Sequence, residues 1–242
     1  MAELRAVVAA AGRGTRAGLP YPKTLFPVLG KPILIRIAEL LEPYDPQPTV
    51  IVSPEGEAPV RECLAQHGKA AHLVVQREPR GMGEAVLHFA HSPAFADAED
   101  VLLAWGDIPF IQPETVASLV HAHEDGGNDF TFVTRIAESA YTVVARDAAG
   151  SVVGVVESRE EGVERPRAGE RDIGLFVFRK TLVLDMLQQD LAGKWGKLTG
   201  EHGFLYIIGH LARLGCKVEA LPIATALDLV SLNSLRDIDG YI

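Results

Sequence analysis

The amino-acid sequence predicts an α/β fold built on a doubly wound sheet. Short apolar runs alternate with helix-like segments through the first half of the chain, which is the pattern of parallel strands joined by helices. The run 101–105 is apolar throughout, as expected for a central strand that is buried on both faces. Residues 6–10 form another apolar run, too short for a helix, that breaks into a glycine-rich loop.

Periodicity and turn residues define the other elements of the first half. Apolar residues recur at helical spacing after Pro32, and a cluster of three prolines between 43 and 48 ends that helix. Gly68 ends the next helix in the same way. The expected elements are, in order, strand 6–10, helix 33–41, strand 49–52, helix 57–67, strand 72–75, helix 83–90, strand 101–105 and helix 115–123.

From residue 129 onward, strand-like segments follow one another closely, which predicts a smaller lobe built onto the first half. A charge-rich stretch runs from 158 to 172, within which Glu160 and Glu161 with their basic neighbours are expected to form a solvated loop. We expect a single domain over 1–242, divided into a half at 1–110 and a lobe at 111–242. The elements expected in the second half are strands 129–135, 141–146, 152–157 and 173–178, helices 180–191 and 204–214, and strand 217–222.

Charge and cysteine content exclude several classes of function. The net charge is −9 and the pI is near 5.4, which argues against binding to nucleic acid or to an anionic membrane. The two cysteines, Cys63 and Cys216, lie far apart without the spacing of a metal site. With no signal peptide or membrane-spanning run in this sequence, we expect a cytoplasmic protein.

The loop after the first strand has the composition of an anion site. Gly12, Gly14 and Gly18 allow close approach of the backbone and the positive φ values that aim successive N–H groups at one point. Arg16 and Lys23 add two cations from the same loop. The loop therefore reads as a clamp for a triphosphate.

The run from Ala10 to Arg16, followed at a fixed distance by Pro22 and Lys23, resembles the signature of sugar-phosphate nucleotidyltransferases. It is most similar to the uridylyltransferase domain of N-acetylglucosamine-1-phosphate uridylyltransferases. It lacks the Gly-Lys-Ser/Thr ending of ATPase phosphate loops and the third glycine of dinucleotide-binding loops. The resemblance implies a Rossmann-like mixed sheet of the GT-A type, with a nucleotide-binding half and a sugar-binding lobe. No hexapeptide repeats are present, so an acetyltransferase domain is not expected.

The same resemblance assigns the phosphate and metal residues. It gives catalytic roles to Arg16, Lys23 and Asp107, the last in the pair Gly106-Asp107 at the end of the central strand. Asn233, in the segment Ser231–Ser234, matches the second magnesium ligand of the family, so Asp107 and Asn233 are expected to hold Mg²⁺ as the cofactor. The expected phosphate-loop contacts are Ala10, Ala11, Gly12, Gly14, Thr15 and, from the central strand, Gly106.

Base recognition is expected from the segment that follows the third strand. Gln76 offers both a donor and an acceptor to the edge of a base. Gln76 with Gly81, Met82 and Gly83 is similar to the family's uracil-reading segment. Met82 stands where these enzymes usually have threonine, and Glu84 where they usually have histidine. Recognition of a pyrimidine remains the expectation, with UTP favoured.

The sugar side departs further from the family pattern. Glu157 matches the sugar-contacting glutamate, and Tyr141-Thr142 resembles a Tyr-Gly pair that lines the sugar pocket. Asp172 falls where an asparagine is expected, and Tyr206 where an aspartate is usual. Thr142, Glu157 and Asp172 are the predicted sugar-binding residues.

These observations predict a Mg²⁺-dependent nucleotidyltransferase. It would condense a nucleoside triphosphate with a sugar 1-phosphate, N-acetylglucosamine 1-phosphate or similar, to give a nucleotide sugar and pyrophosphate. Two alternatives stay open: a cytidylyl- or guanylyltransferase acting on another phosphorylated acceptor, and a non-catalytic sensor of nucleotide sugars. The expected partners are these two substrates, and assembly into a homo-oligomer is compatible with the sequence.

Overall fold

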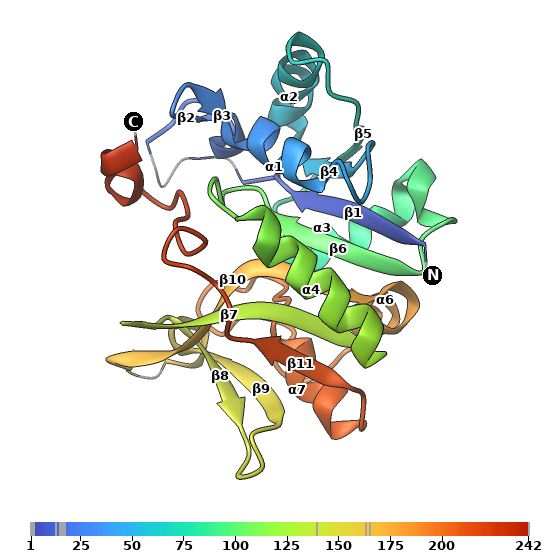
Figure 1. Cartoon of the computed structure of the whole chain (residues 1–242), viewed down its shortest axis with the longest axis vertical. Helices are drawn as coiled ribbons and strands as arrows, with labels where there is room; N and C mark the ends of the chain where they lie inside the picture. Colours follow the sequence, from blue (N-terminus) through green and yellow to red (C-terminus); the bar gives the residue numbers. More distant parts are fainter. Residues whose placement is uncertain are drawn as a thin grey trace.

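The computed structural model of the protein describes residues 3–12, 14, 18–138, 140–162, 164 and 166–241, with only the backbone described for residues 159 and 161. Among these residues, seven strands form one central sheet in the order β11-β7-β10-β6-β1-β4-β5 (Figure 1). Strands from both halves of the chain therefore pair in the same sheet.

The elements follow one another along the chain as an α/β half and then a strand-rich half. They are β1 (Leu4–Ala9), β2 (Pro27–Val28), β3 (Lys31–Pro32), α1 (Ile33–Leu41), β4 (Thr49–Val52), α2 (Pro54–Gln66), β5 (His72–Val75), α3 (Met82–Leu87), β6 (Asp100–Trp105), α4 (Pro113–Gly126), β7 (Phe130–Glu138), β8 (Thr142–Arg146), β9 (Val152–Glu157), α5 (Ser158–Glu161), β10 (Ala168–Arg179), α6 (Lys180–Gln188), α7 (Tyr206–Arg213) and β11 (Val218–Leu221).

The sheet is mixed, as expected. Strands β5, β4, β1 and β6 run parallel, while β10 pairs antiparallel with both β6 and β7. The apolar run of β6 lies between β1 and β10 and is buried, which confirms the central strand. The predicted α/β fold class is confirmed.

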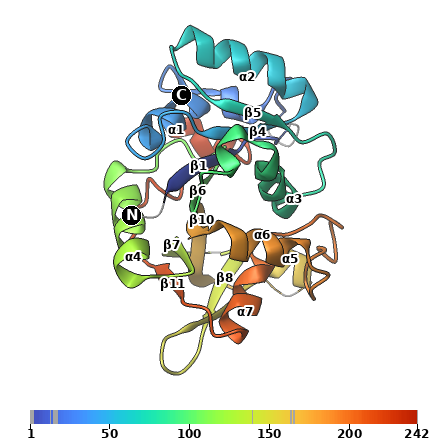
Figure 2. The same cartoon turned by 90° about the vertical axis from the view of Figure 1, so that its right-hand side faces the viewer.

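Two apolar cores cover the two faces of the sheet because successive strand residues point to opposite sides. Val8 and Leu102 belong to a core that also contains buried residues of α1, α2 and α4. Their neighbours Val7 and Leu103 belong to a second core with α3, α6 and α7. Figure 2 shows α4 on one side of the sheet and α3 and α6 on the other. Helices thus cover both faces, which is the doubly wound arrangement.

Two predictions for the charge-rich stretch were wrong: the loop around Glu160 and Glu161, and the start of the following strand at residue 173. Residues 158–161 form α5, and β10 already begins at Ala168. The first residues of β10 pair with the far end of β7, with Ala168 opposite Glu138. Glu170 in this part accepts hydrogen bonds from Thr134 and Arg146. Partners distant in the sequence stabilise this charged strand, so local alternation of apolar residues does not reveal it.

The lobe of the second half is built on the long β7–β10 pair and the hairpin of β8 and β9. Helix α7 packs against β9. In the described part of the chain, no helix combines the length and the apolar character that crossing a bilayer requires.

Candidate active site

The candidate site lies at the carboxyl ends of the parallel strands, where ligands bind in sheets of this type. The chain leaves β1 at Ala10, whose N–H donates to Ile51 of β4, and leaves β6 at Gly106, whose N–H donates to Ala9. A Cβ at position 106 would come within 3.0 Å of the backbone of Ala10. Gly106 therefore lets two strand ends touch at the point from which the phosphate loop begins.

The phosphate loop brings Lys23 to the end of β6. The Lys23 ammonium forms an ion pair with the carboxylate of Asp107. The Lys23 side chain passes over Gly12, where a Cβ would lie 2.9 Å from Lys23 Cε. Gly14 has a φ of 74°, which an L side chain rarely adopts. The structure thus joins Gly12, Lys23 and Asp107, whereas the predicted residues Thr15 and Arg16 lie outside the described residues.

The segment that contains Asn233 contacts the chain at Asp107, and the metal pair of Asp107 and Asn233 stays a prediction. The N–H of Leu232 donates to the main-chain oxygen of Asp107 at 2.8 Å. The amide nitrogen of Asn233 donates to Ser231 Oγ, which leaves the amide oxygen as the atom suited to a cation. A carboxylate and an amide oxygen fit Mg²⁺, with phosphate oxygens and water completing the coordination.

Gln76 follows β5 directly and is buried, with 4% of its surface exposed. Its side-chain amide donates to the main-chain oxygen of Gly81 at 3.3 Å. The structure therefore joins the two residues predicted to read the base. Gly81 has a φ of 110° and precedes α3, whose first residue is Met82.

A cavity of about 290 Å³ opens beside the end of β6. Met82 and Trp105 line it from the nucleotide-binding half, while Thr142 and Glu157 line it from β8 and β9. Residues 193–205, which we term the closing segment, supply another wall that includes His202. The cavity therefore brings together Met82, Thr142 and Glu157, which were predicted to bind the base or the sugar. Trp105, which also lines it, lies two residues before Asp107 in the chain.

Asp172 lies behind this cavity and is only 1% exposed. Thr142 Oγ1 donates to Asp172 Oδ1, while Asp172 Oδ2 accepts no hydrogen bond of ordinary geometry from the described residues. Burial raises the pKa of Asp172, opposed by the Thr142 hydrogen bond and the charge of Arg171. Burial, with the nearby charge of Asp172, also raises the pKa of Tyr141 to about 12. Asp172 is thus held against the wall of the cavity through Thr142.

Replacing Asp172 with Asn is expected to stabilise the protein at neutral pH. A carboxyl whose pKa is raised on folding stabilises the folded state below its unfolded pKa of about 3.9, and this contribution is lost as the pH rises through the folded pKa. An amide does not ionise and still accepts from Thr142. The Tm at pH 7 should rise by a few degrees, at about 2–4 °C for each ~1 kcal/mol, and the gain should vanish near pH 3.

Asp228 provides the matched control because it is equally buried but both of its carboxylate oxygens accept hydrogen bonds. Asp228→Asn should lower the Tm at pH 7. An Asp172→Asn protein no more stable than the wild type at pH 7 would contradict this view of Asp172.

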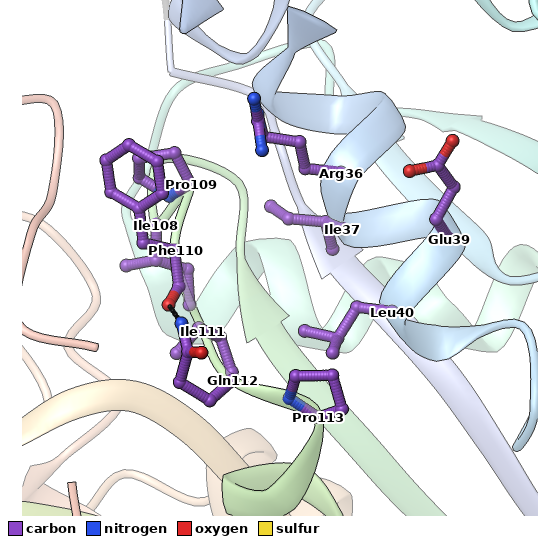
Figure 3. A pocket seen from close by; sticks show the side chains of 10 residues that line it. All are labelled: Arg36, Ile37, Glu39, Leu40, Ile108, Pro109, Phe110, Ile111, Gln112 and Pro113. Carbon is purple, nitrogen blue, oxygen red and sulfur yellow. Dashed lines mark hydrogen bonds between the residues drawn. The ribbon is translucent and has the colours of Figure 1, made fainter. Parts of the chain in front are cut away.

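A second cavity, also of about 290 Å³, lies between α1 and the turn that follows β6 (Figure 3). Its wall is mostly apolar and includes Ile108 and Phe110. The Arg36 guanidinium donates to the main-chain oxygen of Val28 and lies 5.7 Å from the centre of the Phe110 ring. None of the predicted site residues that the structure describes lines this cavity.

Two residues of the site, Trp105 and His202, were not predicted. Trp105 reads from the sequence as the last residue of a buried strand, although its ring lines the cavity. His202 is 1% exposed and lies in a segment without regular secondary structure. No local pattern marks His202, because part of its surroundings comes from α3, which lies more than a hundred residues earlier in the chain.

Comparison with known families matches residues 6–173 to the MobA-like NTP transferase domain. Two similar curated relatives are named bifunctional protein GlmU. The one from Alkalilimnicola ehrlichii is 32% identical over 233 residues, 95% of this chain and 48% of the relative. The one from Symbiobacterium thermophilum is 31% identical over 239 residues, 96% of this chain and 49% of the relative. The chain spans about half the length of these relatives.

Among solved structures, a Bacillus anthracis protein assigned as a glucose-1-phosphate thymidylyltransferase superposes with a TM-score of 0.75. The match covers 98% of this chain and 95% of that one at 15% identity, and it shows a shared fold. The resemblance to sugar-phosphate nucleotidyltransferases of the GlmU type is confirmed by the sequence matches. The chain belongs to the family of MobA-like NTP transferase domains.

Proposed function

We propose that the protein is a sugar-1-phosphate nucleotidyltransferase that transfers a nucleotide from UTP to N-acetylglucosamine 1-phosphate or a similar sugar phosphate. The observation that carries this proposal is the contact of Lys23 with Asp107 at the glycine-rich loop, directly beside a cavity large enough for an acceptor. Family membership and the names of the relatives support nucleotidyl transfer to a sugar phosphate.

The chemistry requires two anions to be held in line. The attacking phosphate oxygen is already negatively charged at neutral pH, so no general base is needed. Lys23 would lie between the α-phosphate and the attacking phosphate, and preorganised charge of this kind stabilises the transition state. Arg16 and the N–H groups of Gly14 and Thr15 would hold the outer phosphates. Mg²⁺ on Asp107 and Asn233 would supply further positive charge to the phosphate oxygens.

The base and the acceptor would bind on either side of this centre. Gln76 and Gly81 would read the base, and Met82 would lie between the base and the cavity. Thr142 and Glu157 would bind the sugar, with Asp172 supporting Thr142 from behind. The free thiols of Cys63 and Cys216 suit the reducing cytoplasm, which we propose as the location.

A pyrophosphate-release assay tests the reaction. The common nucleoside triphosphates are crossed with a panel of sugar phosphates and alcohol phosphates, with and without Mg²⁺. We expect the fastest release with UTP and a sugar 1-phosphate, and none without a divalent ion. Release only with CTP or GTP would support a transferase with another base. No release from any pair would contradict the proposed enzyme and leave the nucleotide-sugar sensor.

Gln76→Ala is expected to weaken the preference for UTP over the other nucleoside triphosphates. Because the amide would read the base edge, its loss should lower kcat/KM for UTP by about tenfold, the size of one hydrogen bond, with smaller losses for other nucleotides. The readout is the ratio of kcat/KM values. Gln66→Ala is the control, since the Gln66 amide is exposed on α2 and donates a hydrogen bond to Glu62. An unchanged preference would remove Gln76 from base recognition.

A further inference from the structure

His202 is the residue at which the base-reading segment meets the acceptor cavity. Its main-chain N–H donates to Arg80 at 2.6 Å, and its main-chain oxygen accepts from Gly83 at 3.0 Å. These two bonds bracket Gly81 and Met82, the residues expected to contact the base. Because His202 also lines the cavity, it joins the base-reading segment, which it contacts through its main chain, to the wall of the cavity.

The base-reading segment and the closing segment pack so closely at His202 that no side chain fits between their backbones. A Cβ at position 81 would overlap the main-chain oxygen of His202. A Cβ at position 83 would overlap the main-chain oxygen of Gly203 and lie 2.7 Å from His202 Cδ2. Glycine at both positions lets the two backbones touch. A displacement of the base-reading segment must therefore move His202.

The imidazole ring extends that contact to Tyr206 and Trp195, which adjoin the lining residues Leu205 and Gly196. Nε2 lies 3.4 Å from the Tyr206 hydroxyl, and the ring centre lies 5.3 Å from that of Trp195. On the other side, Nδ1 lies 3.7 Å from Glu84 Oε2 and has no hydrogen-bond partner. Two neighbours of the ring, Glu84 and Tyr206, are positions at which this chain departs from the family pattern. Two of the departures therefore lie beside the His202 ring, on opposite sides of it.

Burial and the charge of Lys194 favour the neutral form of the His202 ring. Burial lowers the pKa of His202, as does the charge of Lys194 from the closing segment, while Glu84 from α3 opposes both. Tyr206 from α7 contributes a hydroxyl whose own pKa is raised to about 12 by burial. At neutral pH the ring therefore acts as a packed, uncharged link between α3, α7 and the closing segment.

We propose that the His202 side chain is a positioning residue that transmits nucleotide binding to the acceptor cavity through Trp195 and Tyr206. The inference rests on the proposed function, because it takes the segment from Gln76 to Met82 as the base site. Binding at one site then changes affinity at the other, and the coupling is reciprocal. Truncation of His202 uncouples the two sites while leaving the nucleotide site intact.

The test uses the two tryptophans of the chain as reporters. Protein labelled with 5-fluorotryptophan is titrated with α,β-methylene-UTP, which does not react at the α-phosphorus, and followed by ¹⁹F NMR. Trp195→Phe assigns the resonances, and calorimetry measures nucleotide binding independently. We expect the Trp195 resonance to shift on binding in the wild type and to stay fixed in His202→Ala, with nucleotide affinity changed less than threefold, a difference below that of one hydrogen bond.

His123 provides the matched control. It is 3% exposed, and its Nε2 lies 3.7 Å from Asp100 Oδ2, the same separation as that of the His202–Glu84 pair. His123→Ala should lose stability yet keep the Trp195 response. If His202→Ala does not fold, His202→Gln replaces it, since Gln keeps an amide but not the ring face against Trp195.

Several outcomes separate this inference from the proposed function. Calorimetric binding without a Trp195 shift in the wild type would overturn the inference alone, as would an unchanged shift in both His202 variants. Absence of nucleotide binding would contradict the proposed function and this inference with it. In turnover assays at saturating nucleotide, His202→Ala should raise the acceptor KM about tenfold, while the calorimetric affinity for nucleotide alone changes little. An unchanged acceptor KM in both His202 variants would also overturn the inference.

Discussion

Replacement of Asp107 with Asn is expected to lower turnover by about a hundredfold or more. Asp107 supplies the only net negative charge of the proposed metal pair, since Asn233 contributes an amide. It also holds Lys23 at the end of β6 through their ion pair. The substitution keeps the size of the side chain and removes the charge, so positive charge is no longer fixed beside the phosphates. The measurement is kcat from pyrophosphate release at saturating substrates and Mg²⁺.

Asp129→Asn is the control for this prediction. Asp129 pairs with Arg179 and accepts from the Lys217 main chain, well away from the phosphate loop, so its loss should affect stability and not kcat. Asn233→Ala should give a smaller loss than Asp107→Asn, because the amide carries no net charge. Near wild-type turnover in Asp107→Asn would reject Asp107 as a catalytic residue.

Lys23→Met is expected to lower turnover to a similar extent, on the order of a hundredfold or more. The substitution keeps an unbranched side chain of similar length over Gly12 but removes the charge that would stabilise the α-phosphate. The same variant should bind Mn²⁺ more tightly in the absence of nucleotide, because Lys23 no longer occupies the carboxylate of Asp107. For this one substitution, turnover should therefore fall while the affinity for Mn²⁺ rises.

Lys31→Met tests whether loss of any lysine ion pair has these effects. Lys31 pairs with Glu39 at 2.6 Å, and both side chains are exposed. We expect wild-type turnover and wild-type Mn²⁺ affinity from this control. Retention of full turnover by Lys23→Met would remove Lys23 from the reaction. Unchanged Mn²⁺ affinity in Lys23→Met would show that the Lys23–Asp107 ion pair does not compete with the metal.

The parts of the fold that local patterns determine were predicted from the sequence. The strands at 49–52 and 72–75 have the expected limits, because proline and glycine bound short apolar runs there. The sequence also predicted Asp107 at the end of β6 beside the glycine-rich loop, since the ends of neighbouring parallel strands meet at one edge of the sheet, and in the structure Asp107 pairs with Lys23 of that loop. A motif within a single loop and a rule of sheet topology were sufficient to bring these residues together, and their binding of phosphate stays a prediction.

Features that depend on distant partners were not predicted. The start of β10 at Ala168 requires the far end of β7, and the burial of Asp172 requires β8. The role of His202 requires Gly81 and Gly83, which lie more than a hundred residues earlier in the chain. Their contact depends on the absence of two Cβ atoms, which a sequence shows only as two ordinary glycines.

The central claim is that the glycine-rich loop, Lys23 and Asp107 form the binding site of a nucleoside triphosphate. Crystals grown or soaked with Mg²⁺ and α,β-methylene-UTP test it most directly. We predict electron density for the triphosphate over Gly12 and Gly14, with the metal on Asp107 and Asn233 and the base against Gln76. Well-defined density for the nucleotide at another place, away from the end of β1, would contradict the account.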